Sequence, residues 1–124
     1  ACAAALKTIE LLEREYLQNA AEVGQYALDA LAEIAARHPS IGEVRGIGMM
    51  IGVEFVSDKA SKEPADKLRD AVVHNAFERG LLLLGCAKSV IRIAPPLSMS
   101  KAEMDEGLKV FEESISLAEK AMGM

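Results

Sequence analysis

The chain has 124 residues, the length of one domain, and 51% of them are hydrophobic. Fourteen basic and nineteen acidic residues give a net charge of −5, and the only aromatic residues are two Tyr and three Phe. This composition excludes intrinsic disorder. It also argues against a nucleic-acid-binding module, which needs a basic surface for phosphates and aromatic rings for bases. Two cysteines, Cys2 and Cys86, are too few for a disulfide-stapled miniprotein.

The first residues do not have the pattern of a targeting segment. Ala1–Leu6 is apolar but has no basic flank before it, and no apolar run approaches the roughly 20 residues of a membrane span. His38 and His74 have no second ligand at helical spacing, so no zinc site is predicted. We therefore expect a cytoplasmic protein with reduced thiols, no membrane contact and no metal.

Two helices are predicted at the start of the chain. The first covers residues 2–16, and its opening turns have almost no polar residues. A helix end that is apolar on all sides is normally buried on all sides. One small domain rarely supplies that much cover, which indicates a missing part upstream. The second helix, residues 19–37, should end before Pro39, and Gly24 in its interior indicates a break or a close contact.

The hydrophobic period then changes from 3.6 to 2. Residues 49–56 carry one wholly apolar and one mixed face, which predicts a half-buried strand. A helix is predicted from Pro64 to a left-handed cap at Gly80. Residues 81–84 and 90–94 are short apolar runs on either side of a turn, and they predict two antiparallel strands.

The last helix opens with Ser100-Lys101-Ala102-Glu103, a capping-box pattern, and continues with an apolar stripe of about five turns. The order of elements predicts an α/β (α+β) fold: a three-stranded split βαβ sheet with helices on one face. Three strands leave two free edges, and unpaired sheet edges are unfavourable for a domain that stands alone because they can pair with other chains.

Three features resemble catalytic elements but fit simpler roles. The glycines between Arg45 and Gly52 lack the spacing and the strand-to-helix context of a dinucleotide fingerprint, so tight turns or close backbone approaches are favoured. Lys88 lies in a polar turn, where nothing lowers the pKa of its amine as a Schiff-base lysine requires. Cys86 has no histidine nearby in sequence and fits a small buried hydrophobe.

Arg92 is the strongest candidate for a binding residue. It lies in the middle of Val90–Ala94, a strand that looks central, where an unpaired buried charge would be prohibitive. Its planar guanidinium suits a carboxylate or a phosphate. The residues alone leave three interpretations open: a ligand, an internal pair with an acidic residue such as Glu54, or an exposed strand face.

Three segments together resemble one enzyme family. Residues 44–55, VRGIGMMIGVEF, are similar to the VRGxGLMxGIE segment of class III (ornithine / 4-aminobutyrate type) pyridoxal-phosphate aminotransferases. Gly80–Leu84 with Ile91–Leu97, GLLLL and IRIAPPL, resemble the closing GLLL…IRxAPPL pattern of that family. Ala1–Leu6 resembles the helix start that follows its GNPxACAAAL motif.

The resemblance implies the C-terminal part of a homodimeric transaminase of fold type I. Residues 1–38 would be linking helices and residues 39–124 the C-terminal small domain, packed on a large domain of the same polypeptide. Arg92 aligns with the family's arginine that binds a substrate carboxylate. The substrates implied are a 4-aminobutyrate- or ornithine-like amine or amino acid and a 2-oxo acid.

The family's lysine that carries pyridoxal phosphate, and its other cofactor-binding residues, are expected upstream of residue 1. No cofactor-binding or catalytic residue is therefore predicted in this chain, and the chain alone is expected to be inactive. Racemases and mutases share the same C-terminal motifs, so the reaction stays open between these classes. The alternative is a stand-alone, non-catalytic α/β interaction or dimerisation module.

Overall fold

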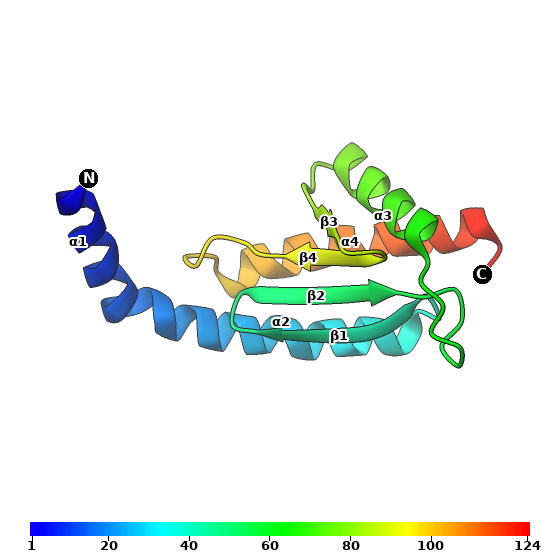
Figure 1. Ribbon diagram of the computed structural model, residues 1–124, viewed down its shortest axis with the longest axis horizontal. Helices are drawn as coiled ribbons and strands as arrows, with labels where there is room; N and C mark the ends of the chain where they lie inside the picture. The colour runs from blue at the N-terminus through cyan, green and yellow to red at the C-terminus, as the bar shows by residue number, and fades with distance from the viewer.

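A four-stranded antiparallel sheet with helices packed on one face forms the body of the computed structural model, which describes residues 1–124 (Figure 1). The elements in chain order are α1 (Cys2–Leu11), a π-helical turn (Leu12–Tyr16), α2 (Leu17–Arg37), β1 (Ile41–Ile47), β2 (Met50–Phe55), α3 (Asp66–Glu78), β3 (Leu84–Cys86), β4 (Val90–Ile93) and α4 (Lys101–Met122). The mixed α/β class agrees with the sequence prediction.

The sheet has four strands in the order β1-β2-β4-β3, so the prediction of three strands is wrong. The missing strand is β1, which pairs antiparallel with β2 along its whole length. Two glycines and two charged residues in seven positions leave this segment only a short alternation at residues 43–45. β1 tolerates that composition because it lies at the sheet edge and forms a hairpin with its neighbour.

Glycines in the β1–β2 hairpin allow a tight turn and a close backbone approach, as expected. Gly48 occupies the turn with a φ of +53°, a conformation that suits a residue without a side chain. Gly24 on α2 lies directly against this turn, and a Cβ there would stand 2.2 Å from the carbonyl oxygen of Gly48. The helix is not broken at Gly24, so the close contact explains this glycine. A hairpin is not the strand-to-helix turn of a dinucleotide site.

The two N-terminal helices form one bent rod. A π-helical turn at Leu12–Tyr16 joins α1 to α2, and the rod bends there, as extra residues within a helix commonly cause (Figure 1). α1 has no buried residue; 69% of Leu6 and 52% of Ile9 are exposed. The cover that the apolar start requires is therefore not supplied by this chain. No helix combines the length and apolar character needed to cross a membrane.

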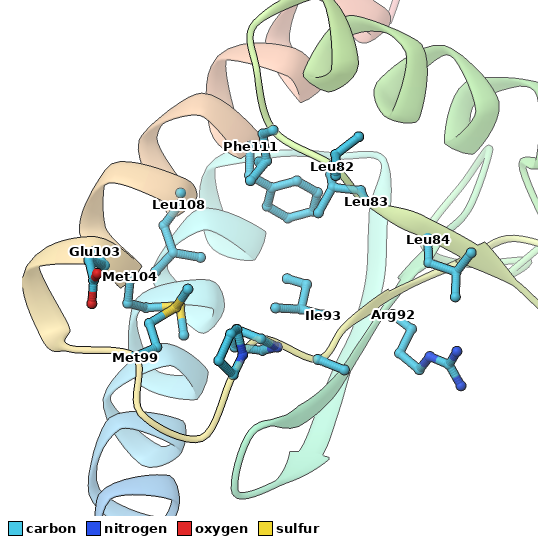
Figure 2. A pocket seen from close by; sticks show the side chains of 15 residues that line it. Leu82, Leu83, Leu84, Arg92, Ile93, Met99, Glu103, Met104, Leu108 and Phe111 are labelled. Carbon is cyan, nitrogen blue, oxygen red and sulfur yellow. The ribbon is translucent and has the colours of Figure 1, made fainter.

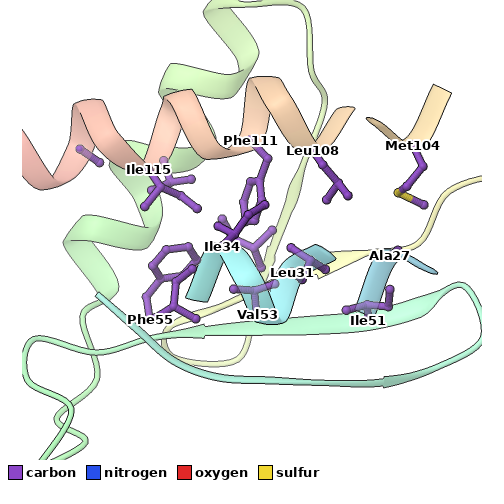
Figure 3. Packing of buried hydrophobic residues seen from close by; sticks show 14 of the residues in the cluster. Ala27, Leu31, Ile34, Ile51, Val53, Phe55, Met104, Leu108, Phe111 and Ile115 are labelled. Carbon is purple, nitrogen blue, oxygen red and sulfur yellow. The ribbon is translucent and has the colours of Figure 1, made fainter. Parts of the chain in front are cut away.

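The core lies between the sheet and the helices (Figure 3). Seventeen buried residues form it, with α2, β2 and α4 contributing most of them. Phe55 and Phe111 meet edge to face with ring centroids 6.4 Å apart. Val23, Ala27, Leu31 and Ile34 recur at helical spacing along α2 and are buried. The predicted stripe of α4 is buried too, except for Met122, which is 45% exposed. The capping box of Ser100 and Glu103 is present in α4.

Two predicted boundaries shift for identifiable reasons. α3 begins at Asp66 rather than at Pro64, because Pro64 forms a bridge with Val56 at the end of the sheet. Residues 81–83 are not strand, because the backbone N–H of Leu81 still bonds the carbonyl of Ala76 and completes the helix end at Gly80 (φ +84°). Only Leu84–Cys86 pairs with β4.

A buried polar cluster links the end of α2 to the end of α4. Ser40 donates its hydroxyl (2.6 Å) and its backbone N–H (3.2 Å) to Oε1 of Glu119, and Nδ1 of His38 lies 2.7 Å from Oε2. Burial opposes ionisation of this carboxyl, but the hydrogen bonds from Ser40 and His38 outweigh burial and hold the pKa of Glu119 below its ordinary value.

Changing Gly24 to Ala should destabilise the chain although alanine is the better helix former. The helix-propensity gain of up to about 1 kcal/mol is smaller than the cost of overpacking against backbone, roughly 1–3 kcal/mol. Gly107→Ala in α4 is the matched control, because its Cβ would meet nothing closer than Leu81 Cδ1 at 3.9 Å. Urea unfolding should show a lower free energy of unfolding for Gly24→Ala and a higher one for Gly107→Ala. Equal gains for both would contradict the close contact.

Acid should weaken the fold through Glu119. Because its pKa is lower folded than unfolded, the unfolded chain binds the extra proton, and the stabilisation is complete above the ordinary glutamate pKa of 4.5 and is lost as the pH falls below it. Glu119→Gln should flatten the fall in unfolding free energy between roughly pH 5 and pH 3. Glu113→Gln, at an exposed position of the same helix, should keep the wild-type slope. Identical slopes for all three proteins would count against the cluster.

Candidate functional site

The face of the sheet that points away from the helices holds the candidate site. Arg45, Gly52, Arg92 and Leu84 lie directly opposite one another across β1, β2, β4 and β3. Directly paired residues project to the same side of a sheet. The neighbouring positions Ile51, Val53 and Ile91 are buried against the helices. The row from Arg45 to Leu84 therefore lies on the open face.

Arg92 is exposed on this face and has no ion pair and no side-chain hydrogen bond within the chain. Its strand is central, as expected, but only one side of that strand is covered by helices. Figure 2 shows the guanidinium pointing away from the apolar side chains of α4. Of the interpretations left open by the sequence, the internal pair with Glu54 is wrong, because Glu54 pairs with another residue. Arg92 thus presents free donors on an exposed strand face.

Arg45 is the partner of Glu54. Nη1 of Arg45 lies 2.7 Å from Oε2 of Glu54 and 3.1 Å from Oε2 of Glu43. The hydrogen bond to Glu54 is the largest influence, and it raises the pKa of the Arg45 guanidinium above its ordinary value. The two arginines on the open face therefore differ: Arg45 is neutralised by two carboxylates, and Arg92 is not.

An apolar groove of about 520 Å³ opens beside β4 (Figure 2). It is lined by the segment Leu81–Leu84, by Ile93–Pro96 and by α4 residues that include Met104 and Phe111. Arg92 and Glu103 are its only ionisable lining residues, and Glu103 is engaged in the cap of α4. The groove itself offers surface for apolar groups rather than catalytic chemistry.

The remaining candidates bring no further chemistry together. Lys88 is exposed in the β3–β4 turn, and Cys2 and Cys86 are free thiols, the second half-buried. No group of three or more His, Cys, Asp or Glu side chains could hold a metal ion. All eight lysines are exposed in this chain.

Sequence reasoning missed that Arg45 shares a face with Arg92, because it missed β1. A signal was present in Glu43-Val44-Arg45, where charged side chains alternate with an apolar one directly before the turn at Gly48. That alternation places both charges on one side of a strand.

The sequence matches a known protein family over most of its length. The family model described as aminotransferase class III matches residues 1–115. The chain belongs to the class III aminotransferases. The 4-aminobutyrate aminotransferase GabT of Escherichia coli is 38% identical over 123 residues, which are 97% of this chain and 29% of that protein.

Other relatives in this class III family differ in reaction. The 5-aminovalerate aminotransferase DavT of Pseudomonas putida is 43% identical over 91% of this chain and 27% of that protein. A leucine/methionine racemase of Thermococcus litoralis is 40% identical over 94% of this chain and 27% of that protein. The family therefore contains more than one reaction on amino compounds.

Solved structures show the same fold. A Bacillus anthracis aminotransferase matches with a TM-score of 0.87 and 32% identity, over 94% of this chain and 28% of that chain. A transaminase solved free of cofactor matches with a TM-score of 0.91 and 30% identity, over 99% of this chain and 30% of that chain. This class III chain thus spans less than a third of the length of these relatives.

Proposed function

We propose that this chain is the C-terminal part of a pyridoxal-phosphate-dependent aminotransferase, in which Arg92 binds the carboxylate of the substrate. Residues 1–38 would link a large domain to the small domain at residues 39–124. The observation that carries the proposal is the unpaired Arg92 guanidinium on the open face of a central strand. It stands at the arginine of the IRxAPPL motif that the sequence shares with the family.

Physical chemistry supports an anionic ligand for Arg92. A guanidinium presents paired N–H donors in a fork that matches a carboxylate. In the isolated chain water satisfies these donors. Once a second domain covers the open face, the charge needs a partner of opposite sign, because an unpaired buried charge is strongly unfavourable. Arg45 is already paired with Glu43 and Glu54, so Arg92 is the arginine that is available to a ligand.

The names of the relatives support the same ligand class. 4-Aminobutyrate, 5-aminovalerate, leucine and methionine each carry both a carboxylate and an amino group, and taurine carries a sulfonate with its amino group. These molecules differ in length and side chain but share an anionic group and an amine. An arginine that fixes the anionic group determines which carbon faces the reacting centre, which is a positioning role.

The residues of this chain do not form the site of the cofactor. When bound, pyridoxal phosphate supplies an electron sink for bond breaking at the amino-bearing carbon. Its lysine requires a partly dehydrated pocket, and every lysine here is exposed. We therefore place the cofactor in a large domain of the same polypeptide. This chain contributes the binding and orientation of the substrate through Arg92.

Amino transfer to a 2-oxo acid is the favoured reaction because GabT and DavT are aminotransferases. Racemisation is the second candidate, favoured by the 40% identity to the leucine/methionine racemase. We also propose that the complete protein is a homodimer in the cytoplasm, as the family resemblance implies. A donor that is converted with stoichiometric formation of a new amino acid would identify the transferase.

Changing Arg92 to Ala in the complete enzyme should impair carboxylate-bearing amines far more than a simple amine of similar length. Loss of a charge-assisted pair of hydrogen bonds costs about 3 kcal/mol, which is roughly a 100-fold lower kcat/KM. Steady-state kinetics with both substrates measures the difference. Lys88→Ala removes an exposed cation of the same hairpin and should leave both values near wild type. Equal losses for the two substrates would contradict the role of Arg92.

The isolated chain should not bind pyridoxal phosphate at a specific lysine. Titration of residues 1–124 with the cofactor is expected to give only the weak, unsaturated absorbance change of surface amines. Free lysine at the same amine concentration is the control. A saturable absorption band at one equivalent would overturn the placement of the cofactor outside this chain.

A further inference from the structure

Glu54 has the same register offset to both arginines of the open face. It lies on β2 opposite Glu43 of β1 and Val90 of β4, while Gly52, two positions away, lies opposite Arg45 and Arg92. Glu54 is therefore the diagonal neighbour of each arginine. Diagonal Cβ atoms are about 7 Å apart, which long side chains span easily. Register alone does not decide which arginine Glu54 contacts.

No side chain on the open face separates Arg45 from Arg92. Gly52 lies between Arg45 and Arg92, and its φ is not positive. A Cβ at Gly52 would have Val90 Cγ1 at 3.5 Å as its nearest neighbour, an ordinary contact. The fold thus does not require glycine at this position. The bare backbone leaves the space beside Arg92 open to Glu54 and to a ligand alike.

Glu43 favours the pairing of Glu54 with Arg45 over a pairing with Arg92. It lies directly opposite Glu54, and two carboxylates in that relation repel each other. Nη1 of Arg45 reaches both, at 3.1 Å and 2.7 Å, so one guanidinium relieves the repulsion and holds both carboxylates on the β1 side. Arg92 has no ion pair as a result. Without Arg45, the diagonal neighbour Arg92 is a cation to which Glu54 can turn.

We propose that Arg45 is a positioning residue that holds Glu54 away from Arg92 and so keeps the Arg92 guanidinium free for the substrate carboxylate. The proposal rests on the proposed function of Arg92. Arg45 does not touch the substrate in this scheme. It acts by removing an internal competitor, so its loss lowers the affinity for carboxylates and leaves the reacting centre intact.

The test compares Arg45→Met, Glu54→Gln and the double variant in the complete enzyme. Met keeps the length of the stem without the charge, and Gln keeps the shape of Glu54 without the competing charge. Arg45→Met should raise KM for carboxylate substrates about 3- to 10-fold with little change in kcat, in line with competition from one partly exposed ion pair. A simple amine should keep its KM. Arg45→Lys should retain most of the wild-type affinity.

Rescue distinguishes positioning from a structural role. The double variant Arg45→Met/Glu54→Gln should return KM for carboxylates to within about 2-fold of wild type, because the competitor is gone. Arg79→Met, at the exposed C-cap residue of α3, should change nothing and serves as the control. Thermal unfolding of each variant shows whether it is folded, and turnover of the simple amine reports an intact reacting centre.

Two results would overturn the proposal in different ways. If Arg92→Ala raises KM for carboxylates but Arg45→Met does not, Arg92 keeps its role and the positioning role of Arg45 is wrong. The same holds if the double variant is as impaired as Arg45→Met, or if carboxylate and amine substrates suffer equally. If Arg92→Ala leaves carboxylate binding unchanged, the proposed function fails and the role of Arg45 with it.

Discussion

One-sided burial of the sheet is the constraint on which the rest of the structure depends. The helix-facing residues of β2 and β4, such as Val53 and Ile91, are fully buried with the stripes of α2 and α4. The opposite face carries Gly52, charged side chains and the exposed Ile47, Met50 and Leu84. Antiparallel sheets accept such asymmetry because alternate residues face opposite sides. This asymmetry allows a strand in the centre of the sheet to present a guanidinium without burying it.

Because only one face of the sheet is buried, the β1–β2 hairpin packs closely against α2 on that face. Gly24 of α2 and Gly48 of the β1–β2 turn meet backbone to backbone. This contact fixes the β1–β2 hairpin, whose register places Arg45 opposite Gly52 and in reach of Glu54. The charge pattern of the open face therefore depends on a contact between two residues without side chains.

Exposed apolar surface gathers outside the core. Leu6 and Ile9 of α1 and Leu82 beside the groove are mostly exposed, and covering such side chains stabilises by about 25 cal/mol per Å². The chain spans less than a third of its relatives. In the proposed function the large domain covers these surfaces, and it turns the open face of the sheet into one wall of the substrate site.

The sequence was sufficient where local chemistry and packing agree. The capping box at Ser100, the stripe of α4 and the stop at Pro39 each follow from side-chain patterns, and each is present. It was insufficient for β1, because a register shift at Gly42 interrupts the alternation between the buried Ile41 and the half-buried Val44, and Gly46 then takes the next helix-facing position. The sequence left Glu54 open as a partner of Arg92, and the structure shows Glu54 paired with Arg45 instead, at 2.7 Å.

A crystal structure of the complete protein with a bound carboxylate inhibitor tests the central claim most directly. The expected result is the carboxylate of the inhibitor within hydrogen-bonding distance of the Arg92 guanidinium above Gly52, with Glu54 still paired to Arg45. A carboxylate bound elsewhere, with Arg92 in an ion pair to a protein side chain or packed in a domain interface, would contradict it.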